Sequence, residues 1–306
     1  MRVTFVCNER IEEGNDVMAR MPTSDPLNLN LSSHTVILYL MASPQSGFAI
    51  VTPASRGIGF AFARYLLQHT DLPIIATARR DSDSLRHRLL GGMENSAAEE
   101  RLNVFNVDVT EESTVRSLAD NIKQTHPQAP LRLALTVPGI LHVEKYPSQI
   151  DAHAALESLK VNTIGPMLLM KHLTPFLPTR SSPLFDPCDG EVRLPQHAIY
   201  AMMAARVGSV SDNRMGGWYS YRASKAAVFQ LAKTLDLYLE GKCADRAISL
   251  AMHPGTVKTD FTKSYQDGRE MLSAEDSAER LLGVLCSLEL EGRGRCWDWK
   301  GYEVRP

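Results

Sequence analysis

From about residue 48 to the C-terminus, short apolar runs alternate with longer stretches that have the periodicity of amphipathic helices. This alternation is typical of βαβ units, in which a helix connects one strand to a parallel neighbour. Stretches of this length can cover both faces of a sheet. The sequence therefore predicts an α/β fold with a Rossmann-type, doubly wound parallel sheet. The predicted strands are Phe48–Thr52, Ile74–Thr77, Leu102–Val107, Leu131–Val137, Ala198–Ala204 and Ala247–Met252, and the predicted helices are about 58–69, 112–125, 152–176, 218–240 and 275–288.

Residues 1–46 differ in character from the rest of the chain. Acidic residues such as Glu12 are unlike a mitochondrial presequence, and the first apolar stretch lies too far from the N-terminus for a signal peptide. We expect a poorly ordered N-terminal extension, with Met41 as a hypothetical alternative translation start. A single domain is expected over residues 47–306, in which the proline-rich segment 178–195 is a surface insertion before a strand.

Composition narrows the class of ligand. The net charge of -2 is spread without charged blocks, which argues against a nucleic-acid partner. No apolar run approaches the roughly 18 to 20 residues that span a bilayer, so no membrane association is expected. The five cysteines and nine histidines show neither disulfide nor metal-ligand spacing. These features favour a cytoplasmic protein without a metal that acts on a small molecule.

The first predicted strand leads directly into a glycine-containing turn and then a helix. The turn reads Thr52-Pro53-Ala54-Ser55-Arg56-Gly57-Ile58-Gly59. A dinucleotide pyrophosphate binds at such a helix N-terminus, and Gly57 and Gly59 allow its close approach to the backbone. The sequence therefore predicts a dinucleotide site at this turn.

The second predicted strand ends in Arg79-Arg80, where an acidic residue would accept the ribose hydroxyls of NAD. An arginine at this position instead suits a 2′-phosphate, and Arg56 could reach the same phosphate. NADP(H) is therefore the predicted cofactor. The alternative is that the two arginines belong to an ordinary solvated turn.

Tyr221 and Lys225 are four residues apart in a predicted helix, so their side chains lie on one face. A phenol has a pKa of about 10, and a neighbouring ammonium that favours the phenolate makes it a usable proton donor and acceptor near neutral pH. The pair therefore indicates carbonyl chemistry. The same spacing also occurs in ordinary surface pairs, so this interpretation depends on the cofactor motifs.

Further motifs follow the glycine turn in a fixed order. They are Asp108-Val109, Thr136-Val137-Pro138-Gly139, Asn162, the Tyr221–Lys225 pair, Pro254-Gly255-Thr256-Val257-Lys258-Thr259 and the closing segment Gly294–Val304. From about Phe48 to the C-terminus, this order resembles the short-chain dehydrogenase/reductase family, and more narrowly the small carbonyl reductases of the C-factor and sniffer type.

The resemblance implies reduction of an aldehyde or ketone by NADPH. Tyr221 would donate a proton to the carbonyl oxygen while hydride reaches the carbon, and Lys225 would lower the tyrosine's pKa and bind the nicotinamide ribose. Asn162 would hold a water behind Lys225, or alternatively tie a helix kink together. The implied cofactor-binding residues are Thr52, Arg56, Gly57, Ile58, Gly59, Arg79, Asp108, Val109, Gly139, Tyr221, Lys225, Pro254, Gly255, Val257 and Thr259.

The sequence departs from the family's pattern at three places. Pro53 replaces the first glycine of the turn, so the turn must differ locally or the cofactor must bind differently. Thr136 and Pro138 alter the segment beside the cofactor. Ala204 and Ala205 stand where the subfamily has serines that polarise the substrate oxygen, and an alanine cannot donate that hydrogen bond.

Ser209 and Ser211 follow this position closely, and we assign the missing hydrogen bond to Ser209, on the condition that the loop turns it inward. Loss of an oxyanion donor typically lowers the rate by about 10² to 10³. Two functions therefore stay open, an NADPH-dependent carbonyl reductase and a catalytically impaired NADP(H)-binding or scaffold protein.

Three further interpretations concern the surroundings of the site. Tyr219 has Ala223 four residues on, so we expect it in a wall of the substrate pocket. His253 ends a strand before a turn, and we interpret it as a packing residue. The helices near 152–176 and 218–240 could form a homodimer interface, or simply pack on the sheet.

Overall fold

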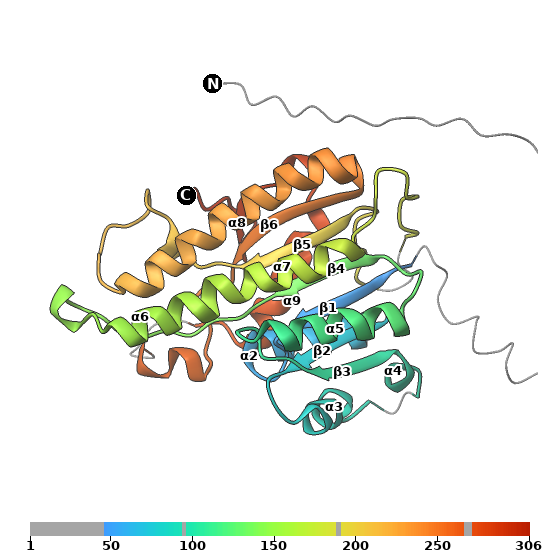
Figure 1. The fold of residues 1–306 in the computed structure, drawn as a ribbon, viewed down its shortest axis with the longest axis horizontal. Helices are drawn as coiled ribbons and strands as arrows, with labels where there is room; N and C mark the ends of the chain where they lie inside the picture. Colours follow the sequence, from blue (N-terminus) through green and yellow to red (C-terminus); the bar gives the residue numbers. More distant parts are fainter. Residues whose placement is uncertain (1–45, 94–95, 188–190, 266–270) are drawn as a thin grey trace, which may run out of the picture. The chain divides into compact units, whose positions relative to one another are not determined.

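The computed structural model describes residues 46–93, 96–187, 191–265 and 271–306. Within these ranges, seven parallel strands form one sheet in the order β3-β2-β1-β4-β5-β6-β7 (Figure 1). The strands are β1 (Phe48–Thr52), β2 (Ile74–Ala78), β3 (Leu102–Asn106), β4 (Leu131–Thr136), β5 (Ala198–Met203), β6 (Ala247–His253) and β7 (Cys296–Asp298). This arrangement confirms the predicted fold class.

The first strand, β1, lies inside the sheet, and the strands that follow it fill one side before the other. β1 pairs with β2 on one edge and with β4 on the other. The loops that leave β1 and β4 therefore run in opposite directions, which opens a crevice at the carboxyl ends of these strands. A ligand site of a doubly wound sheet is expected in that crevice.

Helices cover both faces of the sheet. One face packs against α2 (Gly57–His69), α3 (Ser82–Leu90) and α9 (Ala274–Ser287). The other face packs against α5 (Glu112–Thr125), α7 (Gly165–Leu173) and α8 (Tyr219–Cys243) (Figure 1).

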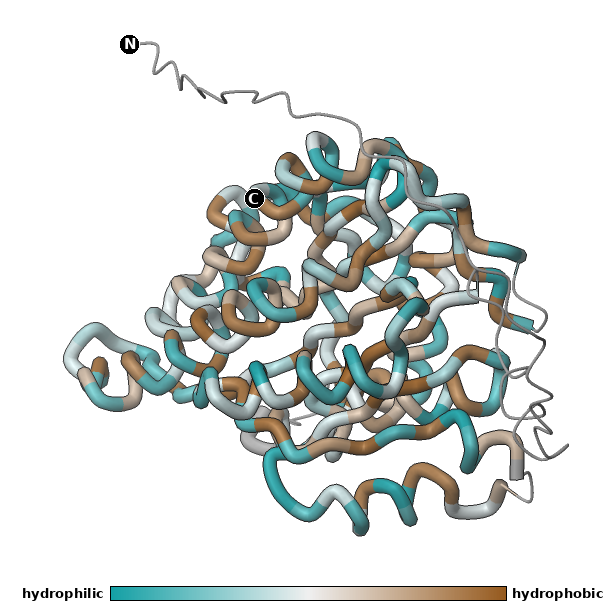
Figure 2. The backbone as a smooth tube through the Cα atoms, turned by 45° about the vertical axis from the view of Figure 1, so that its right-hand side comes forward, coloured by the Kyte–Doolittle hydropathy of each residue, from teal (hydrophilic) through white to brown (hydrophobic). Residues whose placement is uncertain are grey.

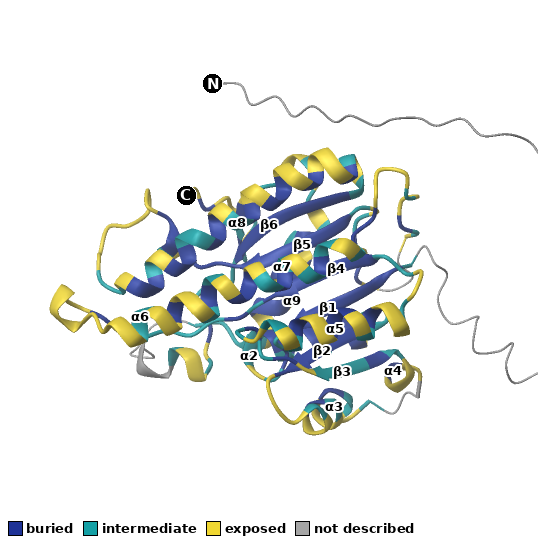
Figure 3. Cartoon of the chain, in the orientation of Figure 1, coloured by how far each residue is buried: buried dark blue, intermediate teal, exposed yellow. Residues whose placement is uncertain are grey.

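Strands β1, β2, β4, β5 and β6 are almost entirely buried between these two layers, whereas only Leu102 is buried in the edge strand β3. All five residues of β1 are inaccessible, and they alternate between the two cores: Val51 belongs to the α2 side and Ile50 to the α5 side. The helices are buried only along their inner faces (Figure 3), and apolar and polar residues alternate along their lengths (Figure 2). Apart from the run that forms the edge strand β3, the apolar runs found in the sequence are thus the buried strands.

The predicted helix over 152–176 is interrupted in the structure. It consists of α6 (Ala152–Leu159), a π-helical turn η2 (Lys160–Ile164), α7 and a 3-10 turn η3 (Thr174–Phe176). Two short helices, α3 and α4 (Ser96–Arg101), were not predicted. The closing segment predicted over 294–304 contains β7, whose Trp297 also pairs with Glu303.

The N-terminal extension and the segment 178–195 differ in how much of them the structure describes. The extension expected over residues 1–46 lies, except for Ser46, outside the described residues. The segment 178–195 has no helix or strand in its described parts, 178–187 and 191–195. Phe185, Val192 and Leu194 are nevertheless buried and anchor it to the core.

Among the described helices, none combines the length and the apolar character needed to cross a bilayer.

Candidate active site

A cavity of about 1200 Å³ opens at the carboxyl ends of the strands. Its walls come from the loops that follow six of the parallel strands, β1 to β6, and from α8, which contributes Tyr221 and Lys225. Most of the predicted site residues meet here although they are spread over 200 positions of sequence. The predicted residues that line the cavity are Arg56, Gly57, Ile58, Gly59, Arg79, Asp108, Val109, Gly139, Tyr221, Lys225, Pro254, Gly255, Val257 and Thr259.

One end of the cavity is formed by the start of α2. Arg56 occupies the N-cap position without a capping side-chain hydrogen bond, and the first turn contains no acidic residue. The helix therefore presents free backbone N–H groups and the positive end of its dipole to the cavity. Gly57 adopts φ +55°, which a residue with a side chain rarely tolerates. This arrangement suits a phosphate group.

The turn before α2 differs from the expected glycine turn. The Thr52–Pro53 peptide bond is cis. Thr52 does not line the cavity, because its hydroxyl accepts a hydrogen bond from the hydroxyl of Thr77 at 2.7 Å between two buried strands. The prediction that Thr52 is a cofactor-binding residue is therefore corrected.

Charged side chains surround the same end of the cavity. Arg79 and Arg80 follow β2, are exposed and line the cavity. Burial acts to raise the pKa of Asp108, but two hydrogen bonds from Thr110 and the charges of Arg79 and Lys160 outweigh it, so the pKa is lowered. Asp108 is thus an ionised group held in a fixed orientation, with Thr110 N and Oγ1 at 2.9 and 2.7 Å from its Oδ1.

Tyr221 and Lys225 lie in the first two turns of α8, and both are buried. The Nζ of Lys225 is 5.9 Å from the centre of the tyrosine ring and donates hydrogen bonds to the backbone oxygens of Met203 at 2.8 Å and Pro138 at 3.4 Å. The hydroxyl of Tyr221 has no hydrogen-bond partner among the described residues. The predicted pair is therefore brought together at the cavity wall.

Burial controls the protonation of this pair. It lowers the pKa of Lys225 to about 8 and raises the pKa of Tyr221. Desolvation by burial is the cause of the raised tyrosine pKa, and the lowering of that pKa by Lys225 stays a prediction. Both groups favour their neutral forms more than they would in water.

A buried carboxylate anchors the start of α8. Glu144 accepts hydrogen bonds from Ser220 N at 2.8 Å and Ser220 Oγ at 2.5 Å, and its backbone oxygen accepts one from Trp218 N at 2.6 Å. A negative charge at a helix N-terminus is stabilising. Glu144 thereby fixes the turn that carries Tyr221. The sequence did not single it out, because it lies in a loop without a motif.

Asn162 lies in the π-helical turn η2 and does not line the cavity. Its Nδ2 donates to Ile140 O at 2.9 Å and Ser224 Oγ at 3.0 Å, while its Oδ1 accepts from Ile140 N at 2.8 Å. The carboxamide thus ties the interrupted helix to the loop after β4 and to α8. Of the two roles considered for this residue, the geometry favours the kink.

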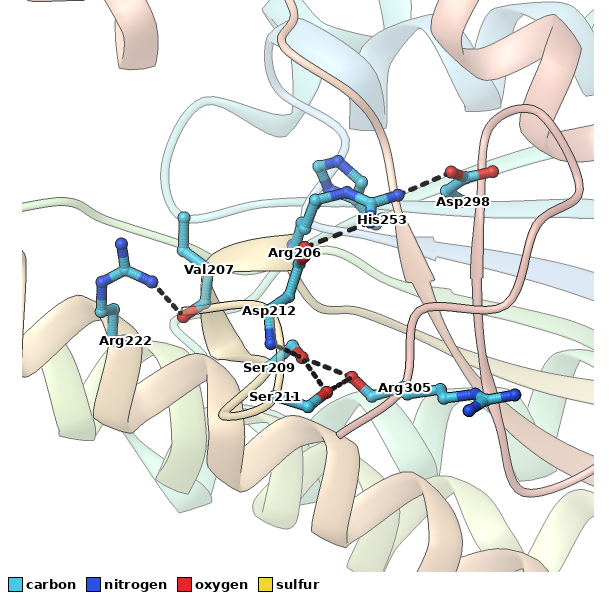
Figure 4. Close-up of polar contacts among 9 residues, drawn as sticks. All are labelled: Arg206, Val207, Ser209, Ser211, Asp212, Arg222, His253, Asp298 and Arg305. Carbon is cyan, nitrogen blue, oxygen red and sulfur yellow. Dashed lines mark hydrogen bonds and ion pairs between the residues drawn. The ribbon is translucent and has the colours of Figure 1, made fainter. Parts of the chain in front are cut away.

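Ser209 does not take the place of the missing serine. Its buried hydroxyl donates to the backbone oxygen of Arg305, lies 3.2 Å from that of Ser211 and accepts from Asp212 N at 3.1 Å (Figure 4). Neither serine lines the cavity, whereas Ala205 does. The assignment of Ser209 as a catalytic residue is therefore corrected: the loop turns its hydroxyl toward the C-terminal segment.

Several cavity residues were not predicted as individual site residues. The ring of Phe261 lies 5.8 Å from that of Tyr221, and its position two residues after the Pro254–Thr259 motif could have drawn attention to it. Tyr219, expected in the substrate wall, does not line the cavity. Other lining residues without a sequence signal come from α6 and from the start of α9: His153, Leu156, Glu157, Ser273, Ala274 and Glu275.

No group of histidine, cysteine or acidic side chains in the described ranges could hold a metal ion. The cavity instead combines an open helix N-terminus, three arginines and a tyrosine–lysine pair. These groups can bind a phosphorylated ligand at one end and exchange a proton at the other.

Comparison with known sequences identifies relatives of the chain. Residues 47–183 match the short chain dehydrogenase family. The C-signal protein of Myxococcus xanthus is 30% identical over 157 residues, which are 51% of this chain and 80% of that protein.

Solved structures show the same fold. The carbonyl reductase Sniffer of D. melanogaster superposes with a TM-score of 0.71 at 21% identity, over 85% of this chain and 99% of that one. A carbonyl reductase from chicken fatty liver, solved with NADPH bound, gives a TM-score of 0.72 at 23% identity, over 86% of this chain and 100% of that one.

Proposed function

Because this chain belongs to the short-chain dehydrogenase family, we propose that it is an oxidoreductase that uses NADPH to reduce the carbonyl group of an aldehyde or ketone to an alcohol. The observation that carries the proposal is the single cavity that joins the free N-terminus of α2 to the Tyr221–Lys225 pair. The chicken enzyme of the same fold holds NADPH, which supports the choice of cofactor.

The residues at the two ends of the cavity fit this cofactor. The backbone N–H groups after Arg56 would bind the pyrophosphate, and Arg79 with Arg80 would bind the 2′-phosphate. Lys225 would bind the nicotinamide ribose. When bound, NADPH supplies the hydride for the reduction.

Tyr221 is the proposed proton donor. Burial raises its pKa, so the hydroxyl keeps its proton at neutral pH and can give it to an oxygen that gains negative charge. Lys225, 5.9 Å from the ring centre, would stabilise the phenolate left behind. The hydroxyl is available for this step because no described residue binds it.

A second function, an NADP(H)-binding or scaffold protein with little catalytic activity, is favoured by one observation. The methyl group of Ala205 lines the cavity at the position of the family's serine and offers no hydrogen bond to a substrate. The two functions share the fold and the cofactor, so only turnover distinguishes them.

The deciding experiment is NADPH consumption with a panel of aldehydes, ketones and quinones. We expect reduction of at least one class, with formation of the alcohol in equal amount to the NADPH consumed. Tight NADPH binding without turnover on any member would instead support the scaffold function. Activity that does not require Tyr221 would reject the proposed mechanism.

Cofactor preference is the first prediction. We expect kcat/KM to be about 10² higher with NADPH than with NADH, and Arg79→Ser to reduce this preference about tenfold, because a charge-assisted hydrogen bond to the 2′-phosphate is lost. Steady-state kinetics with both cofactors provide the measurement. Arg116→Ser, an exposed arginine of α5 outside the cavity, is the matched control and should leave the ratio unchanged.

The second prediction concerns pH. The pKa of Lys225 is about 8, so its charge is present below that pH and lost above it, while the raised pKa of Tyr221 keeps the phenol protonated in the same range. We therefore expect kcat/KM for NADPH, which reports ionisations of the free enzyme, to fall about tenfold per pH unit above pH 8. In Lys225→Met the residual activity should be flat there. A wild-type profile that is level from pH 7 to 10 would contradict this assignment.

A further inference from the structure

The loss of the family's serine leaves one question about the proposed reaction. A carbonyl oxygen that receives hydride on its carbon gains negative charge, and two hydrogen bonds stabilise it better than one. Tyr221 can supply one of them. Ala205 cannot supply the other, and Ser209 points away, so a second donor must come from another wall of the cavity.

His253 is the candidate for this second hydrogen-bond donor. It is the last residue of β6, which pairs with β5, and it lines the same cavity as Ala205 and Tyr221. Its Nδ1 accepts a hydrogen bond from the backbone N–H of Arg206 at 3.2 Å, and Arg206 directly follows Ala205. The imidazole ring is therefore fixed beside the position that the serine would occupy.

This hydrogen bond also determines which ring nitrogen carries the proton. Because Nδ1 accepts, the neutral ring is protonated at Nε2. Nε2 has no hydrogen-bond partner in the parts of the chain that the structure describes. One side of the ring is therefore tied to the backbone, and the other side carries a free donor.

Charged groups around the ring keep Arg206 and the loop in place. The Arg206 guanidinium contacts Asp298 Oδ2 at 2.8 Å and Asp212 Oδ2 at 3.2 Å (Figure 4). The other oxygen of the buried Asp298 accepts from Lys300 N and Tyr302 N, both at 2.9 Å.

Burial and the charge of Arg206 lower the pKa of His253 to about 4, against the opposing effect of the two aspartates. The ring is thus neutral at physiological pH.

We propose that His253 donates a hydrogen bond from Nε2–H to the carbonyl oxygen of the substrate, in place of the serine that Ala205 replaces. This inference rests on the proposed carbonyl reduction. His253 transfers no proton: hydride from NADPH forms the new C–H bond, the π electrons of the carbonyl move to oxygen, and Tyr221 supplies the proton. His253 is therefore a catalytic residue and not only the packing residue that its sequence position indicated.

Two substitutions test the roles of Nδ1 and Nε2 of His253 separately. His253→Asn keeps an acceptor near Nδ1 for Arg206 N but is too short to replace Nε2–H. His253→Gln places an amide N–H near Nε2 but loses the acceptor. We expect His253→Asn to lower kcat about 10²-fold with little change in the dissociation constant of NADPH, and His253→Gln to stay within about tenfold of the wild type. A structural role alone would predict the opposite order.

A second experiment places a serine at position 205. In the His253→Asn background, Ala205→Ser should raise kcat at least tenfold, because a hydroxyl returns to the expected place. An unchanged kcat in His253→Asn would overturn this inference, and so would a loss of kcat that Ala205→Ser does not relieve. In both cases, carbonyl reduction by the wild type would still support the proposed function. A wild-type protein that binds NADPH and reduces no carbonyl would overturn both.

Discussion

Replacing Tyr221 by phenylalanine is expected to lower kcat for carbonyl reduction by about 10³-fold, within the range that a positioned general acid contributes. Phenylalanine keeps the ring, and with it the contacts to Phe261 at 5.8 Å and to the Lys225 ammonium at 5.9 Å. Only the donor of the proton is removed. Because the fold and the phosphate-binding end of the cavity are untouched, NADPH should bind within about twofold of its wild-type affinity.

The measurement is NADPH consumption at saturating cofactor on the most active member of the panel, together with cofactor affinity by fluorescence titration. Tyr219→Phe is the matched control: it removes a hydroxyl from the same helical turn, but Tyr219 is partly exposed and does not line the cavity. Its kcat should stay within about twofold. Equal rates for Tyr221→Phe and the wild type would show that protons reach the substrate by another route.

The helices and strands that could be predicted are those in which buried apolar residues recur at a regular spacing in the sequence. The helix over 112–125 was predicted with the bounds that α5 has, because its apolar residues repeat on one face. The break within 152–176 could be offered only as one of two roles for Asn162, and its form could not be predicted. It depends on the carboxamide of Asn162, which bonds to Ile140 in a loop 22 residues away, and such a contact has no local pattern.

The same distinction applies to the site. Helical spacing places Tyr221 and Lys225 on one face, and the cofactor motifs that occur with them in order distinguished the pair from a surface pair. Ser209 was misassigned because the direction of a loop side chain depends on its tertiary partners, here the backbone oxygen of Arg305. Sequence spacing and motif order therefore located the tyrosine–lysine pair, whereas the orientation of the side chains around it required coordinates.

The substitution with the largest expected effect on stability lies where Gly59 of α2 packs against Pro53 of the preceding turn. A Cβ atom added to Gly59 would clash with the carbonyl oxygen of Pro53 and lie 3.0 Å from Cγ2 of Val137. The first neighbour is backbone and cannot rotate away, so the start of α2 would have to shift. We expect Gly59→Ala to lower the free energy of unfolding by about 3 kcal/mol, the upper part of the range for overpacked cores, and to weaken NADPH binding at the displaced helix N-terminus.

Urea unfolding and NADPH titration of the purified variant provide the measurement. Gly283→Ala in α9 is the matched control, because Gly283 is exposed and nothing lies within 4 Å of an added Cβ. That substitution should raise the free energy of unfolding by about 0.5 to 1 kcal/mol, since alanine loses less backbone entropy than glycine in a helix. If both variants gained stability, Pro53 and Gly59 would not be in contact, and the helix N-terminus would not be positioned by this turn.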